Sequence, residues 1–426
     1  MTDPSARVLA QIEPGPIAEL LCELVRIPSV SGSDAEAEIQ ARLAAWLAAE
    51  GLVVDHWRLP LDELAAEPDF PGTEVPRREA YGLVGRLPGT GGGASLMFNG
   101  HVDVVPPGDL AAWRTGDPYG GELRDGAVYG RGACDMKGGL VAALFAVRAL
   151  RRAAVPLAGD VLIACVAGEE DGGLGTYGLL RRGWRADGCV IPEPTGLDLV
   201  PANGGALTFR LRVPGRAAHA SRRTEGVSAV ERFWPVFAAI RELERRRNAE
   251  VDPVMERWDL AYPIEIGTVA AGDWPSSVPD LLVAEGRLGV ALDEPVAGAR
   301  RDFEAAVAEA CRADPWLRDH PVQVRWWGGQ FAPGRLPADD HGLLSRVGRA
   351  HTAVTSTGAA VWGATYGSDL RLMTNLGGVP TLQYGPGDIA LAHAPDESVP
   401  VREVVTAARV LALTALDHCG LQKLRR

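Results

Sequence analysis

The stretch Gly130-Arg131-Gly132-Ala133-Cys134-Asp135-Met136-Lys137-Gly138-Gly139 places one acidic residue between a glycine-rich approach and a helix. The apolar run at residues 140–150 predicts that helix and predicts that it is buried. Asp135 therefore lies where a loop meets the first turn of a helix. Taken alone, a carboxylate at such a place is typical of a residue that caps the free amide groups of the helix.

Three further apolar runs each lead into side chains that commonly bind metal ions. Residues 96–98 lead to His101, residues 161–167 to Glu169 and Glu170, and residues 189–191 to Glu193. Continuous apolar runs of this length, separated by helical patterns, are typical of strands buried on both faces of a parallel sheet. Because ligands of such sheets bind beyond the carboxyl ends of the strands, these side chains and Asp135 predict a metal site at one edge.

The length and composition of the chain limit what it can be. Its 426 residues exceed what one hydrophobic core normally supports, so we expect two domains. A formal net charge of -12 argues against nucleic acid or an anionic membrane as the main partner. The first residues lack the pattern of a secretory signal, and no apolar run approaches the roughly 18 residues that span a bilayer. Six scattered cysteines without CxxC spacing indicate reduced thiols in a cytoplasmic protein.

The order of the expected elements changes after residue 204. Before it, strand and helix patterns alternate; after it come a strand, a helix, two strands, a helix and a strand, at 207–213, 227–246, 264–269, 281–292, 295–312 and 322–327. This is the ferredoxin-like order. The chain then returns with a helix near 342–350 and a strand at 380–384, followed by a turn that delivers His393. We expect residues 204–330 to form a second domain, inserted into an α/β domain made of residues 1–203 and 331–426.

Two features near the amino terminus carry more detailed expectations. Ser33 and Glu36 have the spacing of a capping box at the start of a helix. The buried stripe of that helix is expected at Ile39, Leu43, Trp46 and Leu47. Residues 55–78 are rich in proline and acidic residues, and they are expected to be a surface excursion.

Five motifs in a fixed order resemble those of one family of zinc amidohydrolases. In chain order they are His101-Val102-Asp103, Gly132-Ala133-Cys134-Asp135-Met136-Lys137-Gly138-Gly139, Gly168-Glu169-Glu170, Pro192-Glu193-Pro194 and Ala392-His393-Ala394-Pro395-Asp396-Glu397. The family contains acetylornithine deacetylase, succinyl-diaminopimelate desuccinylase, aminoacylases and glutamate carboxypeptidases, and the chain resembles the acetylornithine deacetylase-like branch. The resemblance covers nearly the whole chain. It implies a catalytic domain with a mostly parallel, twisted sheet flanked by helices, and an inserted ferredoxin-like dimerisation domain.

The resemblance also implies a pair of zinc ions, for which cobalt or manganese could substitute. It assigns His101 and Glu193 to one metal and Glu170 and His393 to the other. Asp135 is shared, because two cations held about 3.5–4 Å apart need a bridging carboxylate.

Glu169 and Asp103 are expected to assist these ligands. Glu169 and Glu170 are adjacent and cannot occupy the same position, so the pair divides into a base and a ligand. Activated water needs a group that takes its proton and returns it to the leaving amine, and we expect Glu169 to be this group. The alternative is that Glu169 is a carboxylate at the rim of the site without a catalytic role. Asp103 shares a strand face with His101, so its carboxylate is expected to accept the imidazole N–H.

Three side chains are candidates for contact with substrate. His219 resembles the family's histidine that reaches the active site of the partner subunit, although a lone histidine after a strand is more often structural. Arg371 resembles the family's arginine for a substrate carboxylate, with Arg287 as a second candidate and an ordinary salt bridge as the alternative. Ser276 stands where the family often has asparagine, which puts the contacts to the acyl group in doubt.

Together these expectations describe a cytoplasmic homodimer, joined through residues 204–330, that hydrolyses the amide of a small N-acyl amino acid. One alternative is the same chemistry on a dipeptide or on the N-formyl aminopyrimidine that is deformylated in thiamin salvage. Another is a catalytically silent scaffold. The presence of five ligands and Glu169 argues against the scaffold, because a protein without metal chemistry has no physical need for all six.

Overall fold

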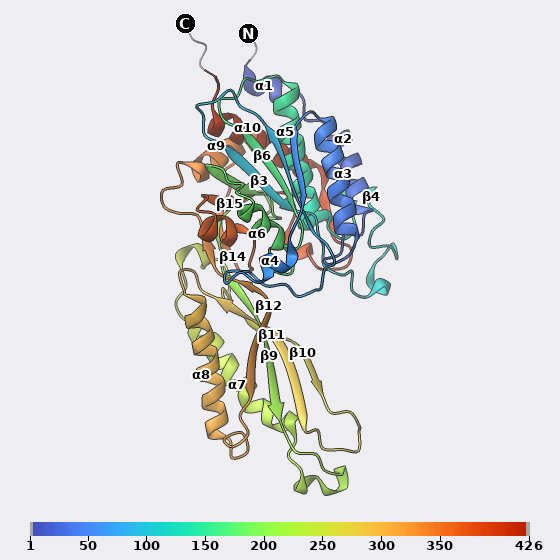
Figure 1. Ribbon diagram of the computed structural model, residues 1–426, viewed down its shortest axis with the longest axis vertical. Helices are drawn as coiled ribbons and strands as arrows, with labels where there is room; N and C mark the ends of the chain where they lie inside the picture. Colours follow the sequence, from blue (N-terminus) through green and yellow to red (C-terminus); the bar gives the residue numbers. More distant parts are fainter. Residues whose placement is uncertain (1–2, 423–426) are drawn as a thin grey trace. The chain divides into compact units, whose positions relative to one another are not determined.

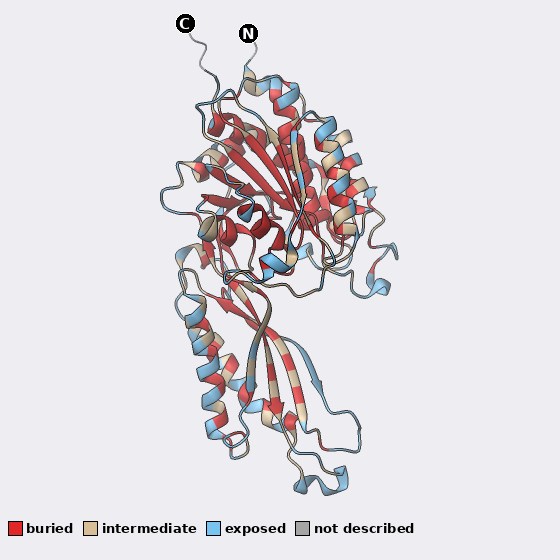
Figure 2. Ribbon diagram, viewed as in Figure 1, coloured by how far each residue is buried: buried red, intermediate tan, exposed pale blue. Residues whose placement is uncertain are grey.

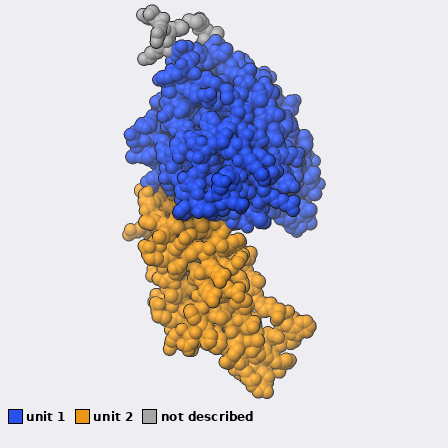
Figure 3. All heavy atoms as spheres, viewed as in Figure 1, with its two compact units in different colours: residues 1–201, 335–362, 368–426 blue, residues 202–334, 363–367 orange. Residues whose placement is uncertain are grey.

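The structure is a computed structural model in which residues 3–422 are described. The chain divides into two compact units (Figure 3). Among the described residues, unit 1 contains 3–201, 335–362 and 368–422, and unit 2 contains 202–334 and 363–367. Residues 204–330, the expected insertion, all lie in unit 2.

The elements follow the chain as labelled in Figure 1. The helices are α1 (Pro4–Leu9), α2 (Pro14–Val25), α3 (Ala35–Ala49), α4 (Leu61–Ala65), α5 (Gly138–Arg152), α6 (Leu174–Arg181), α7 (Ala229–Arg247), α8 (Val296–Ala313), α9 (Leu343–Thr355) and α10 (Val401–Cys419). The strands are β1 (Val53–Arg58), β2 (Tyr81–Leu87), β3 (Leu96–His101), β4 (Glu122–Arg124), β5 (Ala127–Tyr129), β6 (Val161–Val166), β7 (Gly188–Ile191), β8 (Leu199–Asn203), β9 (Gly205–Pro214), β10 (Ile264–Ala271), β11 (Leu281–Val290), β12 (Gln323–Phe331), β13 (Gly334–Arg335), β14 (Val361–Ala364), β15 (Thr381–Gln383) and β16 (Ser398–Pro400). Short helical turns lie at η1 (Leu110–Ala112), η2 (Ala133–Lys137), η3 (Ala220–Glu225), η4 (Pro253–Met255), η5 (Leu372–Leu376) and η6 (Ile389–Leu391).

The largest sheet has a parallel centre and antiparallel edges. Its strands follow the order β1-β2-β6-β3-β7-β15-β8-β13, with β14 paired to β8. The pairs β6–β3, β3–β7 and β7–β15 are parallel, whereas β1–β2, β2–β6 and β15–β8 are antiparallel. The expected α/β class is confirmed, with the parallel strands at the centre of the sheet.

Alternate residues of the central strands pack against different layers of helices. In β6, Val161, Ile163 and Cys165 join a core with α2, α3, α5 and α10, whereas the intervening residues join a core with α4 and α6. Strand side chains point alternately to the two faces of a sheet, so this sheet is covered on both faces. Figure 2 accordingly shows the central strands as buried. A strand buried on both faces admits few polar residues, which explains the apolar runs in the sequence.

Unit 2 is built around an antiparallel sheet in the order β10-β11-β9-β12. With the helices α7 and α8, the elements succeed one another as strand, helix, strand, strand, helix, strand, in the predicted ferredoxin-like order. Phe209 and Phe303 lie in its core with their ring centroids 4.4 Å apart. This unit therefore has a hydrophobic core of its own.

One local prediction near the amino terminus was wrong. The helix α3 begins at Ala35 after Asp34, and Glu36 is buried, where it accepts the Gly32 amide and pairs with Arg77 instead of closing a capping box. Pairing across the fold, which local spacing does not record, decided the partners of Glu36. Residues 55–78 are mostly exposed or intermediate in burial, as expected of a surface excursion, although they contain most of β1 and all of α4.

All six cysteines are buried and free. Among the residues that the structure describes, no helix combines the length and the apolar character needed to cross a bilayer.

Gly139→Ala should destabilise the fold, because α5 passes so close to the chain at Pro192 that an added Cβ would lie 1.7 Å from its carbonyl oxygen. We expect the free energy of unfolding to fall by about 1–3 kcal/mol in urea titrations, the cost of overpacking. Gly15→Ala is the control, since its Cβ would meet nothing within 4 Å. Equal stability of the two variants would contradict this account of the contact.

Candidate metal centre

The candidate ligands lie where the parallel strands of the central sheet end. His101 is the last residue of β3, Glu170 follows β6, and Glu193 follows β7. Since these strands run parallel, their carboxyl ends meet at one edge of the sheet. Asp135 reaches this edge from η2, the turn that leads into α5.

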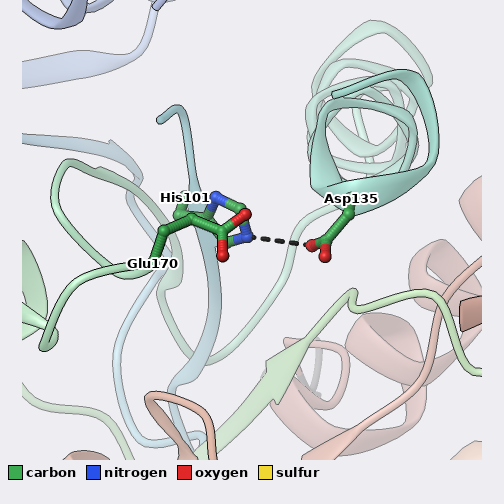
Figure 4. Close-up of side chains that lie close together, drawn as sticks. All are labelled: His101, Asp135 and Glu170. Carbon is green, nitrogen blue, oxygen red and sulfur yellow. Dashed lines mark hydrogen bonds and ion pairs between the residues drawn. The ribbon is translucent and has the colours of Figure 1, made fainter. Parts of the chain in front are cut away.

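Three of these side chains converge closely enough to hold one cation. Among the described residues, possible ligand atoms of His101, Asp135 and Glu170 all lie within 4.8 Å of one another. Nε2 of His101 is 3.2 Å from Oδ1 of Asp135. Figure 4 shows His101 and Glu170 next to each other, with Asp135 facing them from the turn before α5.

A second histidine approaches the same carboxylates from the carboxyl-terminal part of the chain. His393 adopts a left-handed backbone conformation, with φ of 60°. Its Nε2 lies 3.4 Å from Oδ2 of Asp135 and 3.2 Å from Oε2 of Glu170. The two oxygens of Asp135 thus face different histidines.

Glu193 is buried near the same side chains and is 4% exposed. Burial raises its pKa well above the usual value, and the negative charges of Asp135 and Glu170 raise it further. It lies outside the group of three whose atoms meet within 4.8 Å. Its carboxylate therefore belongs to the electrostatic cluster at the sheet edge, and its role as a ligand stays a prediction.

The cluster concentrates negative charge that a buried environment does not tolerate without a counter-charge. Burial raises the pKa of Glu170, and repulsion from Asp135 adds to this effect. Burial also opposes the protonated form of His393, but hydrogen bonds to Asp135 and Glu170 raise its pKa to about 11. For Asp135, burial alone would raise the pKa, but His101 and His393 hold it below its usual value. Positive charge is thus strongly favoured at this point of the sheet edge.

The donor set fits a divalent metal. Imidazole nitrogens and carboxylate oxygens, without a thiolate, suit zinc and other first-row metals. Cys134 does not belong to the group of three, and its Sγ lies 3.4 Å from the carbonyl oxygen of Asp388. The residues at the sheet edge therefore fit the predicted kind of site.

The structure differs from the sequence prediction at Asp103. The nearest acceptor to Nδ1 of His101 is the main-chain carbonyl of Asp103 at 2.9 Å, whereas the carboxylate oxygen lies 3.8 Å away. The carboxylate instead accepts the amides of Glu169 and Glu170, at 3.1 and 3.2 Å, and the hydroxyl of Ser31. The main chain orients the imidazole because the carboxylate turns toward the loop after β6.

Glu169 is enclosed at the same edge, with 7% of its surface exposed. Burial raises its pKa well above the usual value, while the charge of His101 acts in the opposite direction. Its location beside the cluster, on the loop that carries Glu170, is consistent with the base predicted from the sequence. The assignment of that role stays a prediction.

Arg371 does not point its guanidinium at open space, contrary to the expectation of a substrate contact. Its side chain is 2% exposed, and Nη1 and Nη2 donate to the carbonyls of Ser368 and Gly172 at 2.8 and 2.7 Å. The terminal nitrogens donate hydrogen bonds to main-chain carbonyls and so hold two loops in place. This geometry favours a structural role for Arg371.

Unit 2 carries the other two candidates. His219 is exposed at the start of η3, and its Nδ1 accepts the Ser221 amide at 3.2 Å. With Nδ1 accepting this hydrogen bond, Nε2 is the ring nitrogen that can donate one. Arg287 lies on β11 with its guanidinium 5.6 Å from the ring centroid of Phe331. Ser276 lies in an exposed turn, where its carbonyl accepts the Ala220 amide.

Three supporting residues were quoted within sequence motifs but given no role. Glu397 is buried, its Oε1 accepts the amides of Cys134 and Asp135 at 2.9 and 3.0 Å, and its Oε2 accepts a hydrogen bond from Arg131. Lys137 donates to the carbonyls at the end of α2. The sequence showed Glu397 close to His393, and Arg131 and Lys137 close to Asp135. Because the hydrogen-bond partners of these residues lie far away in the sequence, spacing alone could not identify them.

The chain is similar in sequence to known proteins over most of its length. Residues 97–417 match the peptidase family M20/M25/M40. N-formyl-4-amino-5-aminomethyl-2-methylpyrimidine deformylase of Bacillus subtilis is 26% identical over 412 residues, which cover 90% of each chain. Acetylornithine deacetylase of Myxococcus xanthus is 30% identical over 353 residues, 80% of this chain and 85% of that protein.

A solved structure shares the fold. The M20 family metallo-carboxypeptidase from Sulfolobus solfataricus has a TM-score of 0.74 at 15% identity, over 94% of this chain and 98% of its own. Because the family match spans most of the sequence and the five predicted motifs fall in order along it, the chain belongs to peptidase family M20/M25/M40, whose members are metal-dependent hydrolases of amide C–N bonds.

Proposed function

We propose that the protein is a cytoplasmic, homodimeric di-zinc amidohydrolase that removes the acyl group from an N-acyl amino acid. The observation that carries this proposal is the placement of Asp135, whose two carboxylate oxygens face His101 and His393. A carboxylate presented to two sets of donors is what a pair of close cations requires.

The residues that would hold the two ions follow from this placement. His101 and Glu193 would serve one zinc, Glu170 and His393 the other, and Asp135 both. Cobalt or manganese would fit the same donors. Bound cations supply Lewis-acid polarisation of the amide carbonyl and make water more acidic.

Two side chains would move the proton and fix the loop that carries the base. Glu169 takes the proton of the attacking water and returns it to the nitrogen of the leaving amine, so that the C–N bond breaks without releasing an amide anion. The carboxylate of Asp103 holds the amides of Glu169 and Glu170 and thereby fixes the loop that presents both side chains.

A dimer would add one more group. The exposed Nε2 of His219 would donate a hydrogen bond to the oxyanion that develops in the active site of the partner subunit. We propose unit 2 as the dimerisation domain, because it carries this histidine outside unit 1 and has a core of its own.

A second candidate substrate is an N-formyl aminopyrimidine. The Bacillus subtilis deformylase matches 90% of both chains, and Arg371 donates to main-chain carbonyls, which weakens the case for a carboxylate on the substrate. Arg287 stays a further candidate for a carboxylate contact. The chemistry at the metals would be the same for either substrate.

The substrate class should be tested with protein loaded with zinc and, separately, with cobalt. Candidate substrates are acetyl, succinyl, formyl and carbamoyl amino acids, dipeptides, and an N-formyl aminomethylpyrimidine. We expect release of free amine from acyl amino acids, loss of activity on chelation, and recovery on return of the metal. Hydrolysis of the formylpyrimidine alone would establish the second candidate, and no hydrolysis of any amide would refute the proposal.

Glu169→Gln should abolish proton transfer while leaving the metal ligands in place. We expect kcat to fall about 10²- to 10⁴-fold, as is usual for loss of a general base, with an unchanged metal content by elemental analysis. Glu122→Gln, at an exposed glutamate of β4, is the control and should keep normal turnover. A Glu169→Gln enzyme that retained both metals and near-normal kcat would rule out this role.

Subunit mixing should reveal whether His219 acts across the dimer. Homodimers of Glu169→Ala and of His219→Ala should each be inactive. After random reassortment, half of the dimers are mixed and each has one intact site, so roughly a quarter of the wild-type activity should return. Failure to recover activity from confirmed mixed dimers would exclude a shared active site.

A further inference from the structure

Four successive residues of the loop after β6 are fixed by three buried side chains, those of Asp103, Arg77 and Arg371. The carboxylate of Asp103 accepts the amides of Glu169 and Glu170. Arg77 then donates to the carboxylate of Asp171 at 2.8 Å, and Arg371 donates to the carbonyl of Gly172 at 2.7 Å. The residues that carry the proposed base and ligand are therefore held from several directions.

Arg77 is the residue that ties this loop to a helix on another part of unit 1. Its side chain is 3% exposed. Nε and Nη2 donate to the two oxygens of Glu36, in the first turn of α3, at 2.9 and 3.1 Å, while Nη1 donates to Oδ2 of Asp171. One guanidinium thus connects α3 with the residue next to Glu170.

The segment before β2 closes around the same carboxylate. Oδ2 of Asp171 also accepts the amides of Glu74 and Val75, at 3.1 and 3.2 Å. At the start of the loop, a Cβ on Gly168 would lie 3.0 Å from Nη2 of Arg77, and φ of Gly168 is +69°. The guanidinium therefore packs directly against the backbone that turns Glu169 toward the cluster.

We propose that Arg77 is a positioning residue which, through Asp171, sets the location of Glu169 and Glu170 at the metal centre and so controls the rate of amide hydrolysis. This inference rests on the proposed function. A buried ion triad is weak evidence for net stability, because desolvation offsets its attraction. The position of Glu169 and Glu170 gives a stronger reason for the triad, since displacement of a reacting group by about 1 Å can lower turnover roughly 10²-fold.

The role predicts a change in kcat more than in KM. Removal of Arg77 alone would leave two buried carboxylates without a counter-charge, so the test uses the triple variant Glu36→Gln/Arg77→Met/Asp171→Asn, which removes all three charges while keeping similar side-chain volumes. We expect its melting temperature to stay within a few degrees of wild type, its kcat to fall ten- to a hundredfold, and its KM to change less than threefold. Arg77→Lys, which keeps the charge but loses the forked geometry, should have an intermediate kcat.

A matched control uses an arginine of β2. Arg86 pairs with Asp160 at 3.2 Å, but its side chain is 40% exposed and belongs to no group that touches the loop. Arg86→Met should leave kcat unchanged. The visible absorption spectrum of cobalt-loaded protein gives a readout independent of turnover, and it should change in the triple variant, because Glu170 moves, and stay unchanged in Arg86→Met.

The outcomes separate this inference from the function on which it rests. A folded triple variant with kcat within twofold of wild type, or with its loss confined to KM, would overturn the role of Arg77. If the triple variant does not fold, Arg77→Lys decides: a fivefold or larger fall in kcat supports the role, and wild-type turnover overturns it. If the wild type hydrolyses no amide, the proposed function fails. Independently of turnover, an unchanged cobalt spectrum in the triple variant would refute the positioning role.

Discussion

The carboxylate of Asp135 faces two histidines that lie almost 300 residues apart in the chain, and buried contacts within unit 1 keep it there. Its backbone amide is held by Glu397, which is in turn held by Arg131. Gly139 allows the first turn of α5 to lie close against the chain at Pro192, next to Glu193. A carboxylate shared between donors must be fixed in position and orientation, because a small rotation would remove one of its contacts.

The electrostatics of the site follow from bringing several carboxylates to one buried edge. Burial raises the pKa of the three glutamates there, and neighbouring carboxylates raise it further. The two histidines offset part of this charge, which is why their own pKa values are raised despite burial. An arrangement that costs folding free energy in this way is typical of a site built for cations and catalysis.

Several features of the fold and the site could be predicted from local sequence patterns. Apolar runs predicted the central strands because a strand covered on both faces admits few polar residues, and the position of His101 and Glu193 after such runs predicted one common edge. Asp103 and Glu36 were assigned to the wrong partners, and the main-chain partners of Arg371 were not predicted. Each forms hydrogen bonds that depend on which distant segment packs beside it. The spacing of residues in the local sequence was compatible with more than one set of partners.

The sequence by itself determined the family, the order of the elements and the set of side chains that reach the sheet edge, because these depend on residue type and local periodicity. Only the tertiary structure decided how the supporting groups pair: Glu397 with Arg131, Arg77 with both Glu36 and Asp171, and the main-chain carbonyl of Asp103 with His101. Such pairings are set by three-dimensional packing, since a buried polar group takes whichever partner the assembled fold brings within hydrogen-bond distance.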